Sequence, residues 1–355
     1  MFVALRDLRF ARGRFTLIGS VVALITVLVG FLSGLTGGLA VQNVSAVLSL
    51  PGDRIVFSAP GPGGSVSFAD SAVTEQDAAA WAGADGVTAV HPIGISQTRA
   101  EAGDSRAAVA VFGVRPRSDA GAPSGDGLLG LSSAAARELG VGTGDEVTIA
   151  GASYTVEKVG GDGWYSHTPV VEMTLRDWRG YSAATGSPDA WATVLSVTGA
   201  PGPDVTPAAG STVSATPLGS LTALPAFRSE IGSLLLMVTL LFGISGLVVG
   251  AFFTVWTMQR KGDVAVLKAL GASTPSLVRD ALGQALIVLL VGIGSGLVVV
   301  TAFGALAGTA LPFLLSPVTT VLPGGLMTAL GLAGAASALR SVTSADPLTA
   351  LGSNR

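Results

Sequence analysis

The hydrophobic and polar residues of this chain fall in long blocks. Three stretches lack any Asp, Glu, Lys or Arg over a length that could cross a membrane: one after Arg14, one after Glu230, and one over residues 281–339. A spanning helix needs roughly 20 mostly apolar residues. The first two stretches therefore predict one helix each. The third is too long for one span and contains three prolines within 312–323, so it predicts two helices joined by a turn.

This pattern predicts a membrane α-helical protein with four transmembrane helices, one before and three after a large extracellular domain. Strand and helix patterns alternate irregularly in that domain, which predicts an α+β fold. The expected segments are an amphipathic cytoplasmic N-terminal helix (1–15), a first span (16–41), the α+β domain (42–229), a second span (230–257), a cytoplasmic loop (258–280), a third span (281–311), an extracellular turn (312–323), a fourth span (324–339) and a cytoplasmic C-terminus (340–355).

Several local signals within the α+β domain predict the ends of its elements. Thr74 is expected to cap one helix, and Ser132 or Ser133 another that ends at Gly140. The pattern of residues 145–160 predicts a β-hairpin that turns at Gly151 and Ala152.

The charges orient the predicted spans. Half of the chain's 20 Lys and Arg residues lie in the three short pieces 1–15, 258–280 and 340–355, and the much longer region 42–229 holds the other half. Because short cytoplasmic segments are enriched in Lys and Arg, both termini and the 258–280 loop are predicted to be cytoplasmic. We therefore expect a multi-pass protein of the cell membrane with an external α+β domain.

Composition supports a membrane protein. Charged residues make up 12% of the chain, against about 25% in soluble domains, and the mean hydropathy is +0.63. The start resembles a signal peptide, but its apolar part runs beyond the ~7–15 residues of a signal, which favours an uncleaved span. Without cysteine there is neither a disulfide nor a thiolate metal site.

The sequence contains no motif for catalysis or for nucleotide binding. GxxxxGK[ST], HExxH and GxSxG are all absent. We interpret the two histidines, His91 and His167, as surface or turn residues rather than ligands. We expect no catalytic residue, no intrinsic cofactor, no metal beyond a bound haem iron, and no nucleic-acid partner.

Small residues recur at helical spacing in the first span. Gly30, Gly34 and Gly38 are each four residues apart, and such spacing lets two helix backbones approach closely. We expect these glycines to form a packed helix pair, and the pair to lie across a dimer.

A short basic stretch, TMQRKGDVAVLKALGAS, occupies residues 257–273 between the second and third spans. Its apolar residues share one helical face, its charges line the rest, and Gly271 predicts the end of the helix. Such an apolar face is stable only when it is shielded from water. Two interpretations remain open: the helix binds a partner protein, or it folds back on the lipid surface.

This stretch resembles the intracellular signature of the FtsX-like permease family, the MacB-type ABC transporters. The resemblance rests on a basic pair, an acidic residue and the run LKALGAS, and on the C-terminal SADPLTALG. It implies that a coupling helix is seated in a separate ATPase subunit, with two copies of each subunit and with ATP and Mg²⁺ bound by the ATPase. The residues implied in coupling are Arg260, Lys261, Asp263, Leu267, Lys268 and Gly271.

Within the family, the size of the external domain and the start of the chain look most like the haem-exporting (HrtB-type) permeases of Gram-positive bacteria. That resemblance implies an efflux permease that expels haem from the membrane by ATP-driven mechanical coupling. The family also includes cell-division regulators, peptide exporters and lipoprotein extractors. The alternatives are therefore a transmembrane signalling subunit that regulates a cell-wall hydrolase, or an exporter of a peptide antibiotic or lipid.

The start of the second span offers groups that could bind haem. Haem needs an axial ligand and partners for its anionic propionates. Glu230 and Met237 are candidates for the iron, and Arg228 for a propionate. Because Glu230 and Met237 lie ~10 Å apart along one helix, one iron would need them from two chains.

Other roles for these residues remain open. Glu230 is equally a helix N-terminal acid favoured by the dipole, and Met237 a core residue. Gln42, Asp53 and Arg54, near the other membrane junction, could join the site.

Overall fold

The computed structural model describes residues 12–116, 122–199, 212–259, 262, 266, 270–308 and 311–343. The chain divides into two compact units. The membrane unit contains Met1–Gly38 and Ser233–Arg355, and the α+β unit contains Leu39–Gly232. Both divisions fall inside long helices, so two helices contribute residues to each unit.

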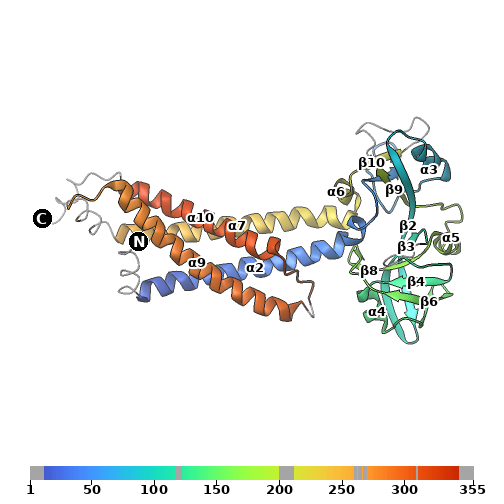
Figure 1. Ribbon diagram of the computed structural model, residues 1–355, viewed down its shortest axis with the longest axis horizontal. Coiled ribbons are helices and arrows are strands. Elements are labelled where there is room, and N and C mark those ends of the chain that lie inside the picture. The colour runs from blue at the N-terminus through green and yellow to red at the C-terminus, as the bar shows by residue number, and fades with distance from the viewer. Residues whose placement is uncertain are drawn as a thin grey trace. The chain divides into compact units, whose positions relative to one another are not determined.

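Among the described residues, four long helices build the membrane unit (Figure 1). They are α2 (Arg12–Leu48), α7 (Pro225–Gln259), α9 (Thr274–Ala307) and α10 (Pro317–Thr343). Each is long and apolar enough to cross a membrane. The membrane α-helical fold with one span before and three after a large domain is thus confirmed. The side of the membrane on which that domain lies stays a prediction.

The helices extend beyond the apolar stretches from which they were predicted. The sequence predicts spans over 16–41 and 230–257, whereas α2 continues to Leu48 and α7 begins at Pro225. Composition reports where a helix is apolar, and not where its backbone hydrogen bonds end. The apolar composition therefore does not predict the polar ends of α2 and α7.

The prolines near the fourth span act differently from the prediction. Pro312 precedes α10, and Pro317 is its first residue, where a missing N–H costs no hydrogen bond. Pro323 lies inside α10 and does not break it. It removes one hydrogen bond, which membrane helices tolerate because neighbouring groups satisfy the freed carbonyl. The fourth helix thus begins at 317 rather than at 324.

Small residues bring the membrane helices close together. A Cβ added to Gly292 of α9 would lie 2.8 Å from Val22 of α2, and one added to Gly296 would lie 2.6 Å from Thr26. A Cβ added to Gly334 of α10 would similarly lie 2.8 Å from the Cα of Gly250 in α7. Within one chain, α2 therefore packs on α9, and α7 packs on α10.

The α+β unit is built on a 10-stranded sheet with the order β10-β1-β9-β2-β3-β8-β4-β6-β5, and β7 pairs with β8. The strands are β1 (Arg54–Ser58), β2 (Val87–Ala102), β3 (Ser105–Val114), β4 (Leu128–Leu131), β5 (Glu146–Ile149), β6 (Ala152–Val159), β7 (Trp164–Tyr165), β8 (Thr168–Thr174), β9 (Val194–Gly199) and β10 (Thr212–Ala215). Because the long strand β2 also pairs with β5, the strands from β2 to β5 in this order close into a ring.

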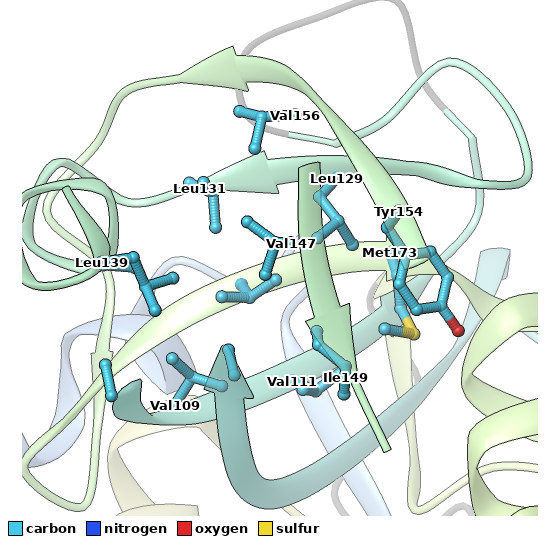
Figure 2. Packing of buried hydrophobic residues seen from close by; sticks show 14 of the residues in the cluster. Val109, Val111, Leu129, Leu131, Leu139, Val147, Ile149, Tyr154, Val156 and Met173 are labelled. Atoms are coloured by element: carbon cyan, nitrogen blue, oxygen red, sulfur yellow. The ribbon is translucent and has the colours of Figure 1, made fainter. Parts of the chain in front are cut away.

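Side chains from every strand of the ring fill its interior (Figure 2). Along β3, Val109 and Val111 face this core, whereas Ala110 and Phe112 face a second core on the other side of the sheet. Neighbouring residues of a strand point to opposite faces, so both faces of β3 are buried. This explains the nearly continuous apolar run of residues 107–114.

Three helices of four turns or fewer cover the sheet: α3 (Glu75–Ala82), α4 (Ser133–Leu139) and α5 (Leu175–Ala184). Thr74 caps α3 through a capping box with Asp77. Ser132 caps α4, which ends at Gly140 with a left-handed φ of 69°. The predicted helix ends are therefore correct, because capping depends on side chains only a few residues away.

The β5–β6 hairpin turns one residue earlier than the sequence predicts. Ile149 pairs with Ala152, which leaves Ala150 and Gly151 as the two turn residues. Their φ values are 49° and 83°, as a two-residue turn between twisted strands requires. The sequence predicts Gly151 as a turn residue, but it does not predict the register of the residues beside it.

The unit also contains α6 (Pro217–Ser220) and a short 3₁₀ helix, Leu221–Ala223, which precede α7. Leu221, Ala223 and Leu224 join the second core. The chain is thus packed against the sheet directly before α7 begins.

Candidate functional site

Three segments of the α+β unit meet at one polar cluster. Asn43 lies near the end of α2, Glu230 lies in the second turn of α7, and His167 lies in the turn between β7 and β8. The cluster therefore joins two helices and a hairpin that are distant in sequence.

Backbone geometry fixes the position of the histidine. Tyr165 pairs with Thr168, so Ser166 and His167 form a two-residue turn, with φ values of 46° and 65°. The N–H of Ser166 donates to the carbonyl of Asn43 (3.0 Å), and that of His167 donates to the carbonyl of Gln42 (2.9 Å). These bonds hold the turn against the last turns of α2.

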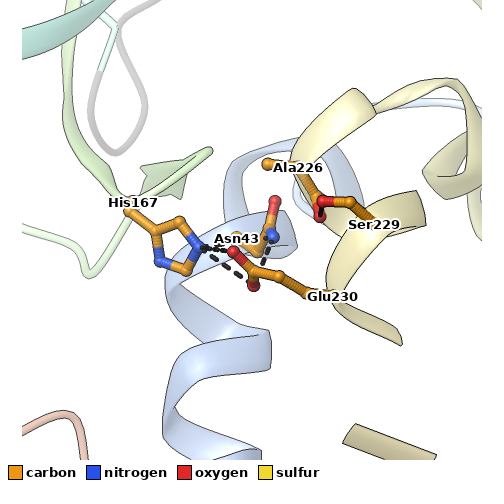
Figure 3. A network of polar contacts seen from close by, with 5 residues as sticks. All are labelled: Asn43, His167, Ala226, Ser229 and Glu230. Carbon is orange, nitrogen blue, oxygen red and sulfur yellow. Dashed lines mark hydrogen bonds and ion pairs between the residues drawn. The ribbon is translucent and has the colours of Figure 1, made fainter. Parts of the chain in front are cut away.

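The side chains of the cluster converge on the carboxylate of Glu230 (Figure 3). The Nε2 atom of His167 lies 3.0 Å from Oε1 and 3.1 Å from Oε2 of Glu230. The Nδ2 atom of Asn43 donates to Oε2 at 3.3 Å and lies 3.5 Å from Nε2 of His167. The imidazole, amide and carboxylate groups thus lie within hydrogen-bonding distance of one another.

Burial differs across the cluster. Asn43 is 1% exposed, and its Oδ1 accepts no hydrogen bond from the residues that the structure describes. The side chains of His167 and Glu230 are 33% and 40% exposed. A ligand from solvent can therefore reach the imidazole and the carboxylate, while the buried amide holds them in place.

The donor set suits a cation or a metal centre. A carboxylate and an imidazole nitrogen are both ligands for iron and other transition metals. The described residues contain no group of three or more His, Cys, Asp and Glu that could hold a metal ion. The cluster could therefore add one or two ligands to a metal that arrives with its own ligands, as haem iron does.

Arg228 and Met237 do not join this cluster. The Nη1 atom of Arg228 donates to Oγ of Ser65 at 3.3 Å. Met237 lies seven residues beyond Glu230 on α7, within the membrane unit, and is 48% exposed. Their proposed roles toward haem stay predictions.

The candidates from the other junction have structural contacts. The carboxylate of Asp53 accepts a hydrogen bond from the N–H of Gly199 (3.0 Å), and Nη1 of Arg54 donates to Oγ of Ser214 (3.2 Å). Gln42 contributes its backbone carbonyl to the turn of His167. Asp53 and Arg54 therefore tie strands together, and Gln42 supports the cluster through its main chain.

The glycines expected at a dimer contact have neighbours within their own chain. A Cβ on Gly30 would lie 2.7 Å from Val300 of α9. A Cβ on Gly34 would overlap the ring of Phe313, and one on Gly38 would overlap the carbonyl of Pro312. The close approach that the spacing predicts is therefore made inside one chain. A second copy would have to contact another face of α2, and the homodimer itself stays a prediction.

Most of the predicted coupling residues lie outside the described residues: Arg260, Lys261, Asp263, Leu267 and Lys268. Gly271 is described and has a left-handed φ of 93°. The N–H of Leu270 donates to the carbonyl of Val266 (3.0 Å), as in a helical turn. A glycine with positive φ directly after such a turn is typical of a helix end. Val266 and Leu270 are both exposed.

The sequence analysis missed His167 and Asn43 as partners of Glu230. Both contacts join residues that are more than 60 positions apart. The one local signal was a two-residue polar gap between Tyr165 and Thr168, which is compatible with a hairpin turn. Nothing in that signal indicates which residue the turn meets.

Comparison with known proteins identifies the C-terminal part of the chain. Residues 230–347 match the family model of the FtsX-like permease C-terminal region. This match is to the family that the 257–273 stretch resembles, and it covers the C-terminal third of the chain. The match begins at Glu230 and covers α7 from that residue on, the following loop, α9 and α10.

The chain is also similar to several whole proteins. It is 26% identical to an uncharacterized ABC transporter permease of Mycobacterium tuberculosis, and the alignment covers 99% of both chains. A second uncharacterized permease of that organism is 27% identical, again over 99% of both. HrtB of Staphylococcus haemolyticus, assigned as a hemin transport system permease, is 32% identical over 126 residues, which is 36% of each chain.

Two solved structures were also matched to part of the chain. The extracellular domain of the transporter YknZ from Gram-positive bacteria is 18% identical, with a TM-score of 0.32 over 41% of this chain and 83% of that domain. The periplasmic region of MacB from Actinobacillus actinomycetemcomitans is 10% identical, with a TM-score of 0.33 over 46% of this chain and 88% of that region.

Proposed function

We propose that this chain is the membrane subunit of a haem efflux transporter. The premise is that it is an ABC transporter permease of the FtsX-like type. A separate ATPase subunit binds ATP and Mg²⁺, and two copies of each subunit form the transporter. The permease itself contributes no catalytic residue. Its α+β unit lies outside the cell, and both of its termini lie in the cytoplasm.

The 258–280 loop is the proposed contact with the ATPase. Its sequence places apolar residues at helical spacing, and the described residues Val266 and Leu270 are exposed. Apolar residues at this spacing are typical of a helix that lies in a groove of a partner. The loop connects α7 to α9, so a displacement of the loop by the ATPase would act on both helices.

The helix α7 links this loop to the candidate site along one continuous element. It extends from Pro225 to Gln259, so that Glu230 lies near one end and the coupling loop follows the other. A helix transmits displacement along its axis because its hydrogen bonds are internal. ATP-driven movement of the loop would therefore change the surroundings of Glu230 and expel a bound substrate.

The observation that carries the haem proposal is the contact between Glu230 and His167. An accessible carboxylate and imidazole, 3.0 Å apart, offer haem iron a ligand of either kind. Arg228 is the proposed partner of a propionate. Met237, from the second chain of the dimer, is the proposed ligand on the other side of the iron. The partial similarity to HrtB supports the same substrate.

A haem titration tests this proposal. The purified full-length chain in detergent is mixed with haemin, and the Soret band is followed. We expect saturable binding at micromolar haemin, and at least tenfold weaker binding for Glu230→Ala. The matched control is Glu138→Ala, which removes an exposed carboxylate from α4 and should leave haem affinity unchanged.

Two outcomes would contradict the haem proposal. One is the absence of a Soret band at micromolar haemin. The other is equal affinity for the wild-type chain and Glu230→Ala. If a deletion strain then showed a cell-wall hydrolase defect without haem sensitivity, the chain would be a signalling permease. If the strain became sensitive to a peptide antibiotic or accumulated a lipid instead, the chain would be an exporter of that compound.

A further inference from the structure

We infer that a cavity in the α+β unit binds a short apolar peptide with free ends. The cavity has a volume of about 700 Å³, within the ~300–1,000 Å³ range of small-molecule sites. All of its lining residues belong to the α+β unit, and neither His167 nor Glu230 is among them. The inference therefore stands apart from the haem proposal.

The register of the sheet places opposite charges in one row of the cavity. Phe112 of β3 pairs with Glu172 of β8, Glu172 pairs with Gly130 of β4, and Gly130 pairs with Lys158 of β6. All four residues line the cavity. Gly130, which has no side chain, lies between Glu172 and Lys158 in this row.

A β-bulge brings Lys158 to this face. Leu129 pairs with Val156, but the next residue, Gly130, pairs with Lys158, so Glu157 is the extra residue. Val156 is in the core of the ring. Without the bulge, Lys158 would share the face of Val156, since residues two apart in a strand point the same way. Bulges often redirect a side chain next to a functional site.

The remaining surface of the cavity is mainly apolar. Ile93, Phe112 and Val170 from the sheet and Ala46 from α2 contribute to it. A second pair of opposite charges, Arg115 and Asp162, lies where the chain is exposed. A purely anionic or purely cationic ligand would meet repulsion from one member of each pair. The lining instead suits a ligand with an apolar body and one charge of each sign.

Strand spacing gives the distance between the two charges of such a ligand. Glu172 and Lys158 lie on strands separated by β4, so their backbones are about 10 Å apart at ~4.8 Å per strand. An extended tripeptide spans about 10 Å at 3.3–3.6 Å per residue. Its ammonium would then lie at Glu172, and its carboxylate at Lys158. A carboxylate has about four acceptor sites, so Glu172 can bind the ammonium in addition to its existing contact.

An occupant of the cavity would also contact α2. Ser45 and Ala46 of that helix, and Ser49 directly after it, line the cavity. Oγ of Ser45 contacts the carbonyl of Asp162 (3.2 Å) and accepts from the N–H of Trp164 (2.9 Å), which ties the helix to the opposite wall. The peptide would thus bind between the sheet and the last turns of the first span.

Calorimetry on the purified full-length chain tests the inference. The probe is the tripeptide Ala-Leu-Ala, and its matched control is the same peptide with an acetylated N-terminus and an amidated C-terminus. We expect the free peptide to bind, and the capped peptide to bind at least tenfold more weakly. Glu172→Gln and Lys158→Met should each weaken binding about tenfold, because each removes one charged partner.

Two further variants separate a binding defect from a folding defect. Glu157 is next to Lys158 in the chain but does not line the cavity. Glu157→Gln should therefore leave peptide affinity unchanged. Ser49→Trp places a bulky side chain at an exposed position of the lining and should abolish binding without lowering the thermal unfolding midpoint.

Three results would overturn the inference: no heat of binding at millimolar free peptide, equal affinity for the free and capped peptides, or unchanged binding in Ser49→Trp. Haemin serves as a competitor. If haemin bound here and responded to Lys158→Met but not to Glu172→Gln, the cavity would be a site for an anionic ligand instead.

Discussion

Nε2 of His167 lies 3.0 Å from Oε1 of Glu230, although 63 residues separate them in the chain. The contact joins the β7–β8 turn to the second turn of α7. It therefore links the position of a helix to the conformation of a turn whose two residues both have positive φ.

Substitutions of His167 should separate the contribution of the ion pair from that of the turn. His167→Asn removes the imidazole, but asparagine tolerates a left-handed φ. The free energy of unfolding should therefore fall by about 1 kcal/mol or less, which is what a partly exposed pair contributes. His167→Val adds left-handed strain of roughly 1–2 kcal/mol. We expect thermal unfolding midpoints to fall in the order wild type, His167→Asn, His167→Val. Equal midpoints for the two variants would contradict the turn geometry.

Close helix packing at Gly38 should not tolerate even a methyl group. Gly38→Ala would push a Cβ into the carbonyl oxygen of Pro312. Overpacking typically costs 1–3 kcal/mol, and a backbone atom cannot rotate away. We expect a clear fall in the thermal midpoint of the purified protein.

The control for Gly38→Ala is Gly19→Ala, in the same helix. An added Cβ there has no neighbour within 4 Å, and alanine is the better helix former. Its midpoint should equal or exceed that of the wild type. If Gly38→Ala were equally harmless, the packing of α2 against the segment before α10 would be wrong.

The glycines of α2 illustrate what the sequence predicts and what it does not. The spacing of Gly30, Gly34 and Gly38 correctly predicts close backbone contact, because periodicity identifies a helix face. It cannot identify the partner, and the partners prove to be Val300, Phe313 and Pro312 of the same chain. Membrane spans follow from composition for a similar reason, since each span is a local property of about 20 residues.

The candidate site was only half predictable. Glu230 stood out as a charge beside an apolar run. His167 did not, because its importance depends on a sheet register that places its turn beside α2. Caps such as Thr74 and Ser132 were predictable because both partners lie within three residues.

The contact between Ser124 and Glu157 should be visible in the pH dependence of stability. The Ser124 hydroxyl and then its N–H, which donate to the carboxylate at 2.6 and 2.7 Å, hold the pKa of Glu157 below its usual value. A lowered pKa in the folded state stabilises the fold above the unfolded-state pKa, and this contribution is lost as the pH falls through the folded-state pKa.

Ser124→Ala removes the hydroxyl and should raise the pKa of Glu157 toward its usual value. The thermal midpoint of the variant should therefore lie below that of the wild type at pH 7, and the two should converge as the pH falls through the folded-state pKa of Glu157. A difference that grows on acidification would contradict the assignment. Ser153→Ala, an exposed serine in the same strand β6, is the control and should show no such convergence.

The central claim is that a separate ATPase moves this permease through the 258–280 loop. The most direct test places a photoreactive amino acid at Leu267 or Lys268 in cell membranes and identifies the crosslinked protein by mass spectrometry, with the same group at Glu138 as the control. The account predicts that the loop positions, and not Glu138, crosslink to a subunit with a GxxxxGK[ST] loop. Crosslinks from Leu267 and Lys268 to lipid alone, without any nucleotide-binding subunit, would contradict it.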